Sequence, residues 1–82
     1  MELRERDRMV LSLLEPNDRA TIESVVDEII EDELPAPEGP HVLAAAGAFD
    51  ARAETSPDDE KVVAWQIAAA LRERARPLEA IH

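Results

Sequence analysis

The chain has 82 residues, a net charge of −10 and no cysteine. Surface scaling for this size predicts that folding buries about 60% of the surface of the unfolded chain, which is marginal for a monomer. The absence of cysteine excludes disulfides and thiolate metal sites. No apolar run has the length of a signal peptide or of a membrane span. We therefore expect one domain over residues 1–82, located in the cytoplasm and not in a membrane.

The acidic residues are concentrated in the middle of the chain. Residues 21–60 contain one arginine and twelve acids, whereas residues 61–82 contain four basic residues and two acids. Nucleic-acid binding depends on Lys and Arg that neutralise phosphates, so this charge argues against a nucleic-acid partner. It favours a basic protein as partner, because an acidic surface steers such a partner inward.

The composition favours helices. Apolar residues make up 45% of the chain, and the aromatic ones are Phe49 and Trp65 alone. Alanine is abundant, whereas the alternating β-branched patterns that predict strands are scarce. We therefore predict an all-α fold of four short helices.

The first predicted helix spans residues 2–15, "ELRERDRMVLSLLE". Pro16 ends it, because the residue before a proline is pushed out of the helical region. Three leucines and one valine form the predicted buried side of this helix: Leu3, Val10, Leu13 and Leu14.

The second predicted helix ends at residue 34 and begins at residue 18 or 21. Asn17, Asp18 and Thr21 can each act as the N-cap, so the start stays open. The apolar residues follow the i, i+3, i+4, i+7, i+8 spacing of a helix with one buried face: Ile22, Val25, Val26, Ile29 and Ile30.

A proline-rich linker, "PAPEGP", occupies residues 35–40 and precedes a third predicted helix over 41–53. Gly47 lies inside that helix, where glycine costs about 1 kcal/mol relative to alanine. Either another backbone packs closely at Gly47 or the helix breaks there.

The fourth predicted helix spans residues 57–76. Ser56 is its expected N-cap, with Pro57 at the first helical position and acids in the first turn. Pro77 is expected to end it. The four helices pack either as a compact bundle or as two helical hairpins joined by residues 35–40.

The fourth helix has two apolar stripes. Val63, Ile67, Ala70 and Leu71 form the first, and Val62, Trp65 and Ala69 form the second, well over 90° around the helix at about 100° per residue. A helix that is apolar on most sides is buried on more than one side. The second stripe is therefore either packed inside the monomer or used as an interface, and the small core favours an interface, most simply a homodimer.

Two charged surfaces are further candidates for interaction. The acids of the second helix lie opposite its apolar stripe, where they form a solvated face or a docking surface for a basic partner: Asp27, Glu28, Glu31 and Asp32. The arginines at the end of the fourth helix form a basic surface and suit the negative end of its dipole: Arg72, Arg74 and Arg76.

Catalytic and cofactor motifs are absent from the sequence. The histidines, His41 and His82, have no partner histidine at helical spacing, and no nucleophile motif or glycine-rich phosphate loop occurs. We therefore expect no enzyme activity, no cofactor and no metal.

The sequence thus predicts a small acidic interaction module: a regulator, adaptor or assembly factor that binds through the fourth helix. Two alternatives remain open. One is a DNA-associated regulator or antitoxin-like protein, and the other is an accessory subunit of an enzyme, with a pocket that holds His41 and a carboxylate.

Overall fold

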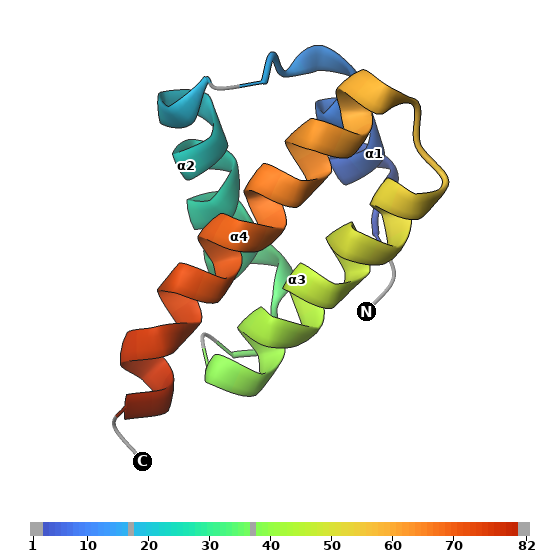
Figure 1. The fold of residues 1–82 in the computed structure, drawn as a ribbon. Helices are drawn as coiled ribbons and strands as arrows, with labels where there is room; N and C mark the ends of the chain where they lie inside the picture. The colour runs from blue at the N-terminus through green and yellow to red at the C-terminus, as the bar shows by residue number, and fades with distance from the viewer. Residues whose placement is uncertain (1–2, 17, 37, 81–82) are drawn as a thin grey trace.

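The computed structural model describes residues 3–16, 18–36 and 38–80, the last three by their backbone only. Within them the chain forms α1 (Glu5–Leu13), α2 (Arg19–Glu28), α3 (Gly39–Glu54) and α4 (Asp58–Ala80), and a π-helical turn, η1 (Ile29–Glu33), continues α2 (Figure 1). No strand occurs in this part of the chain, which confirms the all-α prediction. None of its helices is both long and apolar enough to cross a bilayer.

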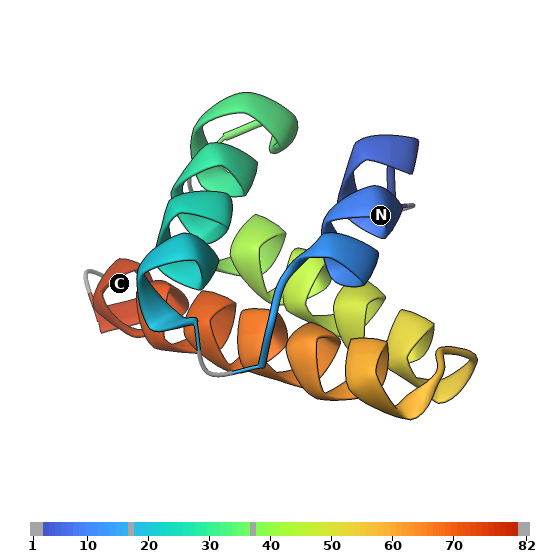
Figure 2. The ribbon, with the colours of Figure 1, turned by 90° about the horizontal axis from the view of Figure 1, so that it is seen from above.

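Helix α4 is in contact with each of the other three α-helices. α3 runs antiparallel beside it, and α1 and α2 both lie on one face of the α3–α4 pair (Figure 2). The opposite face of α4 is not covered by any described helix. α4 therefore has an inner face, turned toward the other helices, and an outer face, turned toward solvent.

All four helices contribute side chains to one hydrophobic core. The first stripe predicted for the fourth helix forms its centre, since Val63, Ile67 and Leu71 are fully buried. Alanines let the helices approach closely around them. The rest of the core comes from each helix in turn: Leu11, Ile22, Val26, Ile29, Val42, Ala45, Ala46, Phe49, Ala53, Ala64, Ala68 and Ala75.

Helix α1 is shorter than predicted and buries a different side. It begins at Glu5, because Arg4 is extended and its backbone N–H donates to the Asp7 carboxylate, 3.2 Å away. Leu11 is 1% exposed and Leu13 is 75% exposed, so the prediction that Leu13 faces the core is wrong. The buried face is the one that contains Asp7, an acid to which the sequence analysis gave no role.

Helix α2 confirms the predicted stripe and settles its start. Asp18 is the N-cap, since its carboxylate accepts the backbone N–H of Thr21 at 3.3 Å. The predicted apolar residues of α2 and η1 all belong to the core or pack against it. The last turn widens into the π-helical geometry of η1 before Leu34 becomes extended.

Helix α3 begins at Gly39, two residues earlier than predicted, with Pro40 in its first turn. Proline is tolerated there because its missing N–H would have no helical partner. The helix passes through Gly47 without a break, and a Cβ added at Gly47 would meet no atom within 4 Å. Both explanations offered for this glycine are therefore wrong, because it faces open space on a continuous helix.

The turn between α3 and α4 also differs from the prediction. The Ser56 hydroxyl donates to the carbonyl of Arg52 at 2.7 Å, so Ser56 closes the end of α3 and does not cap α4. The carbonyl of Pro57 accepts the first helical hydrogen bond of α4, from Lys61. Pro77 does not end α4, which continues to Ala80. Pro77 is exposed, so water can bind the Glu73 carbonyl whose helical donor is lost.

Candidate interaction surfaces

The second apolar stripe of α4 lies on its outer face. Trp65 is 51% exposed and Val62 is 37% exposed, and Ala69 is exposed as well. The ammonium of Lys61 lies 5.9 Å from the centre of the Trp65 ring, a cation–π distance. Within a single chain, therefore, the tryptophan does not pack in the core, and its indole is available to another molecule.

The predicted acidic surface is present on α2 and η1, but one of its four members is occupied. Asp27, Glu28, Glu31 and Asp32 are all exposed. Asp27 forms an ion pair with Arg74 of α4, whereas the other three make no ion pair with a described residue. The free part of this surface consists of Glu28, Glu31 and Asp32.

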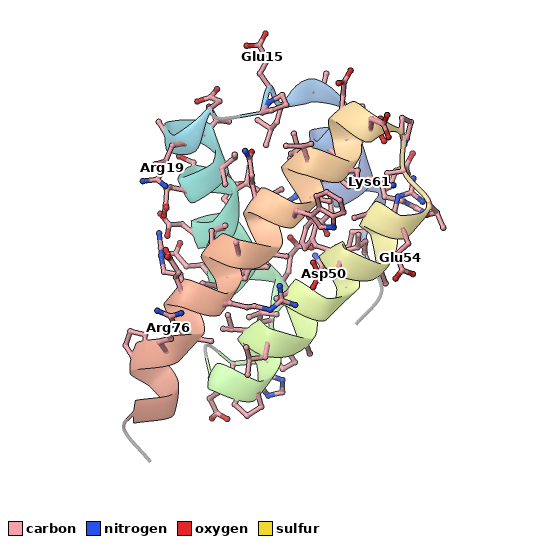
Figure 3. All side chains as sticks on the ribbon, in the orientation of Figure 1. Glu15, Arg19, Asp50, Glu54, Lys61 and Arg76 are labelled. Atoms are coloured by element: carbon pink, nitrogen blue, oxygen red, sulfur yellow. The ribbon has the colours of Figure 1, made fainter. Side chains whose placement is uncertain are left out.

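The predicted basic surface is largely neutralised by carboxylates of the same chain. Arg74 bridges α4 to α2, since it pairs with Asp27 and lies 2.6 Å from Glu23. Its hydrogen bonds to these two acids raise the pKa of the Arg74 guanidinium. Arg72 pairs with Asp50 of α3. Arg76, near the C-terminal end of α4 (Figure 3), has no ion-pair partner among the described residues.

The arginines therefore join helices rather than form a continuous basic face. The DNA-associated alternative needs cations that are free to contact phosphates. Because Arg72 and Arg74 are paired with acids of the same chain, this arrangement does not support that alternative.

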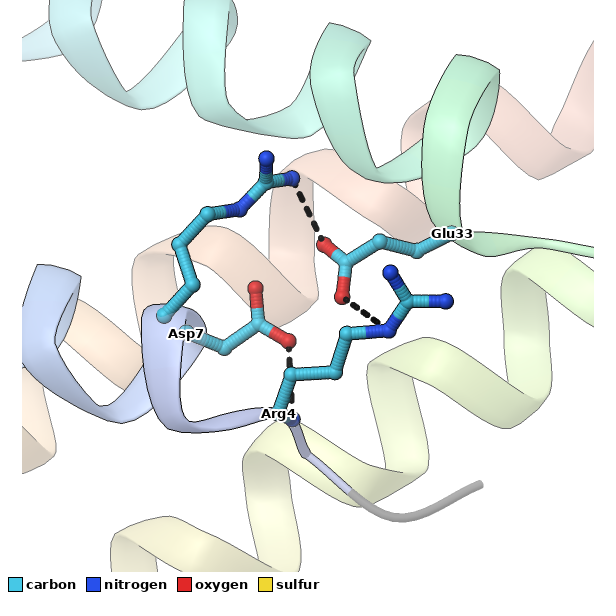
Figure 4. Close-up of polar contacts among 4 residues, drawn as sticks. Arg4, Asp7 and Glu33 are labelled. Atoms are coloured by element: carbon cyan, nitrogen blue, oxygen red, sulfur yellow. Dashed lines mark hydrogen bonds and ion pairs between the residues drawn. The ribbon is translucent and has the colours of Figure 1, made fainter.

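A buried carboxyl pair joins α1 to η1, and the sequence reasoning missed it. The Glu33 side chain is 1% exposed and Asp7 is 2% exposed. Arg4 Nε lies 3.6 Å from Glu33 Oε1, and an Arg6 guanidinium nitrogen lies 3.4 Å from Glu33 Oε2 (Figure 4). The name "carboxyl cluster" is used below for Arg4, Arg6, Asp7 and Glu33.

The carboxyl cluster favours a proton on Glu33. Burial, followed by a side-chain hydrogen bond with Asp7 and the negative charge of Asp7, raises the pKa of Glu33 to about 7, against the opposing effect of Arg6 and Arg4. Glu33 Oε1 is buried and accepts no hydrogen bond. Because a carboxyl–carboxyl hydrogen bond needs one proton, a protonated Glu33 satisfies the pair better than two carboxylates do.

A periodic signal could have identified both acids. Glu33 follows Ile29 by four residues and Val26 by seven, so it continues the apolar stripe of α2. Asp7 lies four residues after Leu3 and four before Leu11, on the buried face of α1. An acid at a stripe position is the pattern that predicts a buried carboxyl group.

The described part of the chain has few other features that could bind a small ligand. An open groove of about 430 Å³ lies between α2 and α4 and is lined by charged, polar and apolar side chains of the two helices, Ala69 among them. No group of acids and histidines in the described part of the chain could hold a metal ion. His41 is half-buried in the first turn of α3 and pairs with no described carboxylate, whereas His82 lies outside the described residues.

No protein-family model, no curated protein and no solved structure matches this chain. The candidate surfaces therefore rest on the geometry of the chain itself.

Proposed function

We propose that the protein is a non-enzymatic protein–protein interaction module, of the regulator, adaptor or assembly-factor kind, that binds another chain through the outer face of α4. One observation supports this proposal most directly. The only tryptophan of the chain is half exposed, beside Val62 and Ala69, and it takes no part in the hydrophobic core.

A half-exposed tryptophan is well suited to binding another chain. An indole buries a large area when it is covered, and tryptophan is enriched among the residues that dominate the binding energy of interfaces. The packing of the monomer gives no reason for an apolar residue at position 65, because the fully buried Val63, Ile67 and Leu71 already supply the inner face of α4.

The acids of α2 and η1 supply a second element of the proposal. Glu28, Glu31 and Asp32 are exposed, and they belong to the segment that carries most of the negative charge of the chain. Such a surface accelerates the approach of a basic protein and orients it, and its contribution weakens as salt is added. We expect these acids to form a second docking surface, for a basic protein, separate from the outer face of α4.

A capture experiment tests the proposal. Immobilised wild-type protein, Trp65→Asp and the matched control Leu13→Asp are incubated with an extract of the cells that produce the protein, and bound chains, other copies included, are identified by mass spectrometry. Leu13 is a suitable control because it is 75% exposed on α1. Circular dichroism checks that all three proteins are folded.

We expect at least one chain to be retained by the wild type and by Leu13→Asp and to be lost with Trp65→Asp. If the wild type and Trp65→Asp retain the same chains in the same amounts, the outer face of α4 is not a binding surface.

A further inference from the structure

The outer face of α4 carries a regular seam of six residues. Their spacing alternates between four and three, which is the spacing of the facing positions in a coiled coil. All six are exposed. The seam consists of Asp58, Val62, Trp65, Ala69, Arg72 and Arg76.

The seam can pair with the seam of a second copy in the antiparallel orientation. When a second copy of α4 is laid antiparallel about a two-fold axis at residue 67, Asp58 meets Arg76 of the second copy. Trp65 then meets Ala69 of the second copy, and Val62 meets Arg72. Every residue of the seam has a partner in the same register, and each contact occurs twice, as a two-fold interface requires.

We propose that the chain that covers the outer face of α4 is a second copy of this protein, packed antiparallel with the seams in contact. The proposal rests on the proposed function, because it names the occupant of the surface described there.

Charge and size both select the antiparallel orientation. A parallel pair would place Asp58 against Asp58 and Arg76 against Arg76, with the two Trp65 rings at one level. The antiparallel pair instead opposes acid to arginine at both ends and sets each large indole against the small Ala69. Antiparallel helix dipoles also attract.

The ion pairs within the monomer leave the seam usable. Among the side chains that the structure describes, none forms an ion pair with Arg76, and Arg76 is exposed at the position that Asp58 of the second copy would meet. Arg72 is held by Asp50 of α3. Its guanidinium is therefore already paired, and its methylene stem can cover Val62 of the second copy.

The dimer is expected to be weak. A single pair of helices of this length buries less than the roughly 1,200 Å² at which stable interfaces begin. Each copy also carries a net charge of −10, which opposes association away from the seam. Near physiological ionic strength this repulsion is screened beyond about 8 Å. We therefore expect a dissociation constant in the range of about 1 to 100 μM.

Charge reversal tests both the dimer and its orientation. Sedimentation equilibrium is measured from about 5 μM to about 1 mM in physiological salt, for the wild type, Asp58→Arg, Arg76→Asp, the double variant, and an equimolar mixture of the two single variants. Glu5→Arg makes the same charge change as Asp58→Arg, but Glu5 is exposed on α1, away from the seam and outside the acidic surface of α2 and η1. The emission of Trp65, the only tryptophan, follows burial of the indole independently.

We expect each single variant to weaken dimerisation about tenfold, since two symmetry-related pairs become repulsive. The double variant and the mixture restore it, because both again oppose Asp to Arg. Glu5→Arg stays within about twofold of the wild type, and Trp65→Ala weakens dimerisation by about 100-fold.

Three results would overturn the antiparallel dimer. These are a wild type that stays monomeric at every concentration, single variants that do not weaken dimerisation, and a double variant that does not restore it. If the wild type is monomeric but Trp65→Asp loses a different protein in the capture experiment, the dimer is refuted and the proposed function stands. A monomer in which Trp65→Asp changes nothing refutes both.

Discussion

The carboxyl cluster between α1 and η1 makes a specific prediction about stability and pH. Burial and the neighbouring Asp7 raise the pKa of Glu33 from 4.5 to about 7 in the folded protein. Folded Glu33 therefore holds its proton more tightly than unfolded Glu33 does. The stabilisation that results is complete below about pH 4.5 and is lost as the pH rises through about 7.

The size of the effect follows from the shift. Each tenfold change in proton affinity is worth about 1.4 kcal/mol, so the change from 4.5 to about 7 contributes about 3 kcal/mol to the free energy of unfolding. This is a large part of the total expected for a domain of this size, which is about 5 to 10 kcal/mol.

The substitution Glu33→Gln isolates this contribution. Glutamine resembles the protonated acid, since its amide can donate to Asp7 and does not ionise. At about pH 4.5 the variant and the wild type are expected to have nearly equal stability. At about pH 8 the variant is expected to be more stable by about 3 kcal/mol, because the wild type must then hold a charged Glu33 beside Asp7.

Urea unfolding followed by circular dichroism, at one fixed protein concentration, measures the difference between the two proteins at each pH. Taking the difference removes the titration of the other acids, which the two proteins share. Glu31→Gln, on the same π-helical turn but exposed, is the matched control and should stay within about 0.5 kcal/mol of the wild type at both pH values. A difference between Glu33→Gln and the wild type that does not change with pH would refute the reasoning.

Three further substitutions test the packing of α3 and α4. Gly47→Ala should raise the free energy of unfolding by about 1 kcal/mol, because the glycine lies on a continuous helix with free space around it; an unchanged urea midpoint would contradict this. Arg74→Gln removes both ion pairs to α2 but should cost at most about 1 kcal/mol, since the side chain is 38% exposed. That cost should disappear in about 1 M salt. Pro77→Ala restores a donor for the Glu73 carbonyl and should add about 1 kcal/mol, less than the ~3 of a helix interior because the position lies near the helix end. A free energy of unfolding no higher than that of the wild type would count against it.

The sequence predicted the order and the type of the helices because their signals are local. Asp18 supplied an N-cap, and the spacing of Ile22, Val26 and Ile29 identified the buried face of α2. The inner stripe of α4 was predicted for the same reason. Such signals depend only on neighbouring residues and on helical periodicity.

The misses have two causes, which are tertiary contacts and the choice between two local alternatives. The sequence pattern fits Ser56 as the N-cap of α4, but its hydroxyl donates to the Arg52 carbonyl in the last turn of α3. Leu13 and Leu11 are equally apolar, and the choice between them depends on which side of α1 meets α4. Pro77 was predicted to end α4. The helix continues past it, because the loss of one backbone hydrogen bond near an exposed helix end costs too little free energy to stop the helix.

The candidate surfaces were predicted only in part, for the same physical reason. Trp65 and the acids of α2 could be assigned to one side of a helix from periodicity alone. Whether Trp65 is covered by the same chain, however, depends on where α1 and α2 lie. The partners of Arg72 and Arg74, at Asp50, Glu23 and Asp27, could not be foreseen either, because they are set by the packing of distant segments.

The carboxyl cluster and the seam lie on opposite faces of the α3–α4 pair, and this separation makes their tests independent. Glu33 and Asp7 belong to η1 and α1, which lie on the inner face of the pair (Figure 2), whereas Trp65 is half exposed on α4, on the side away from the buried Val63, Ile67 and Leu71. Substitutions at sites with no shared contacts have nearly additive effects. Glu33→Gln should therefore change the stability of the monomer at about pH 8 and leave the dissociation constant of the dimer unchanged. Asp58→Arg should weaken the dimer and leave the pH dependence of the monomer as it is. A change in the dissociation constant on Glu33→Gln would mean that η1 and the seam are mechanically coupled through α4.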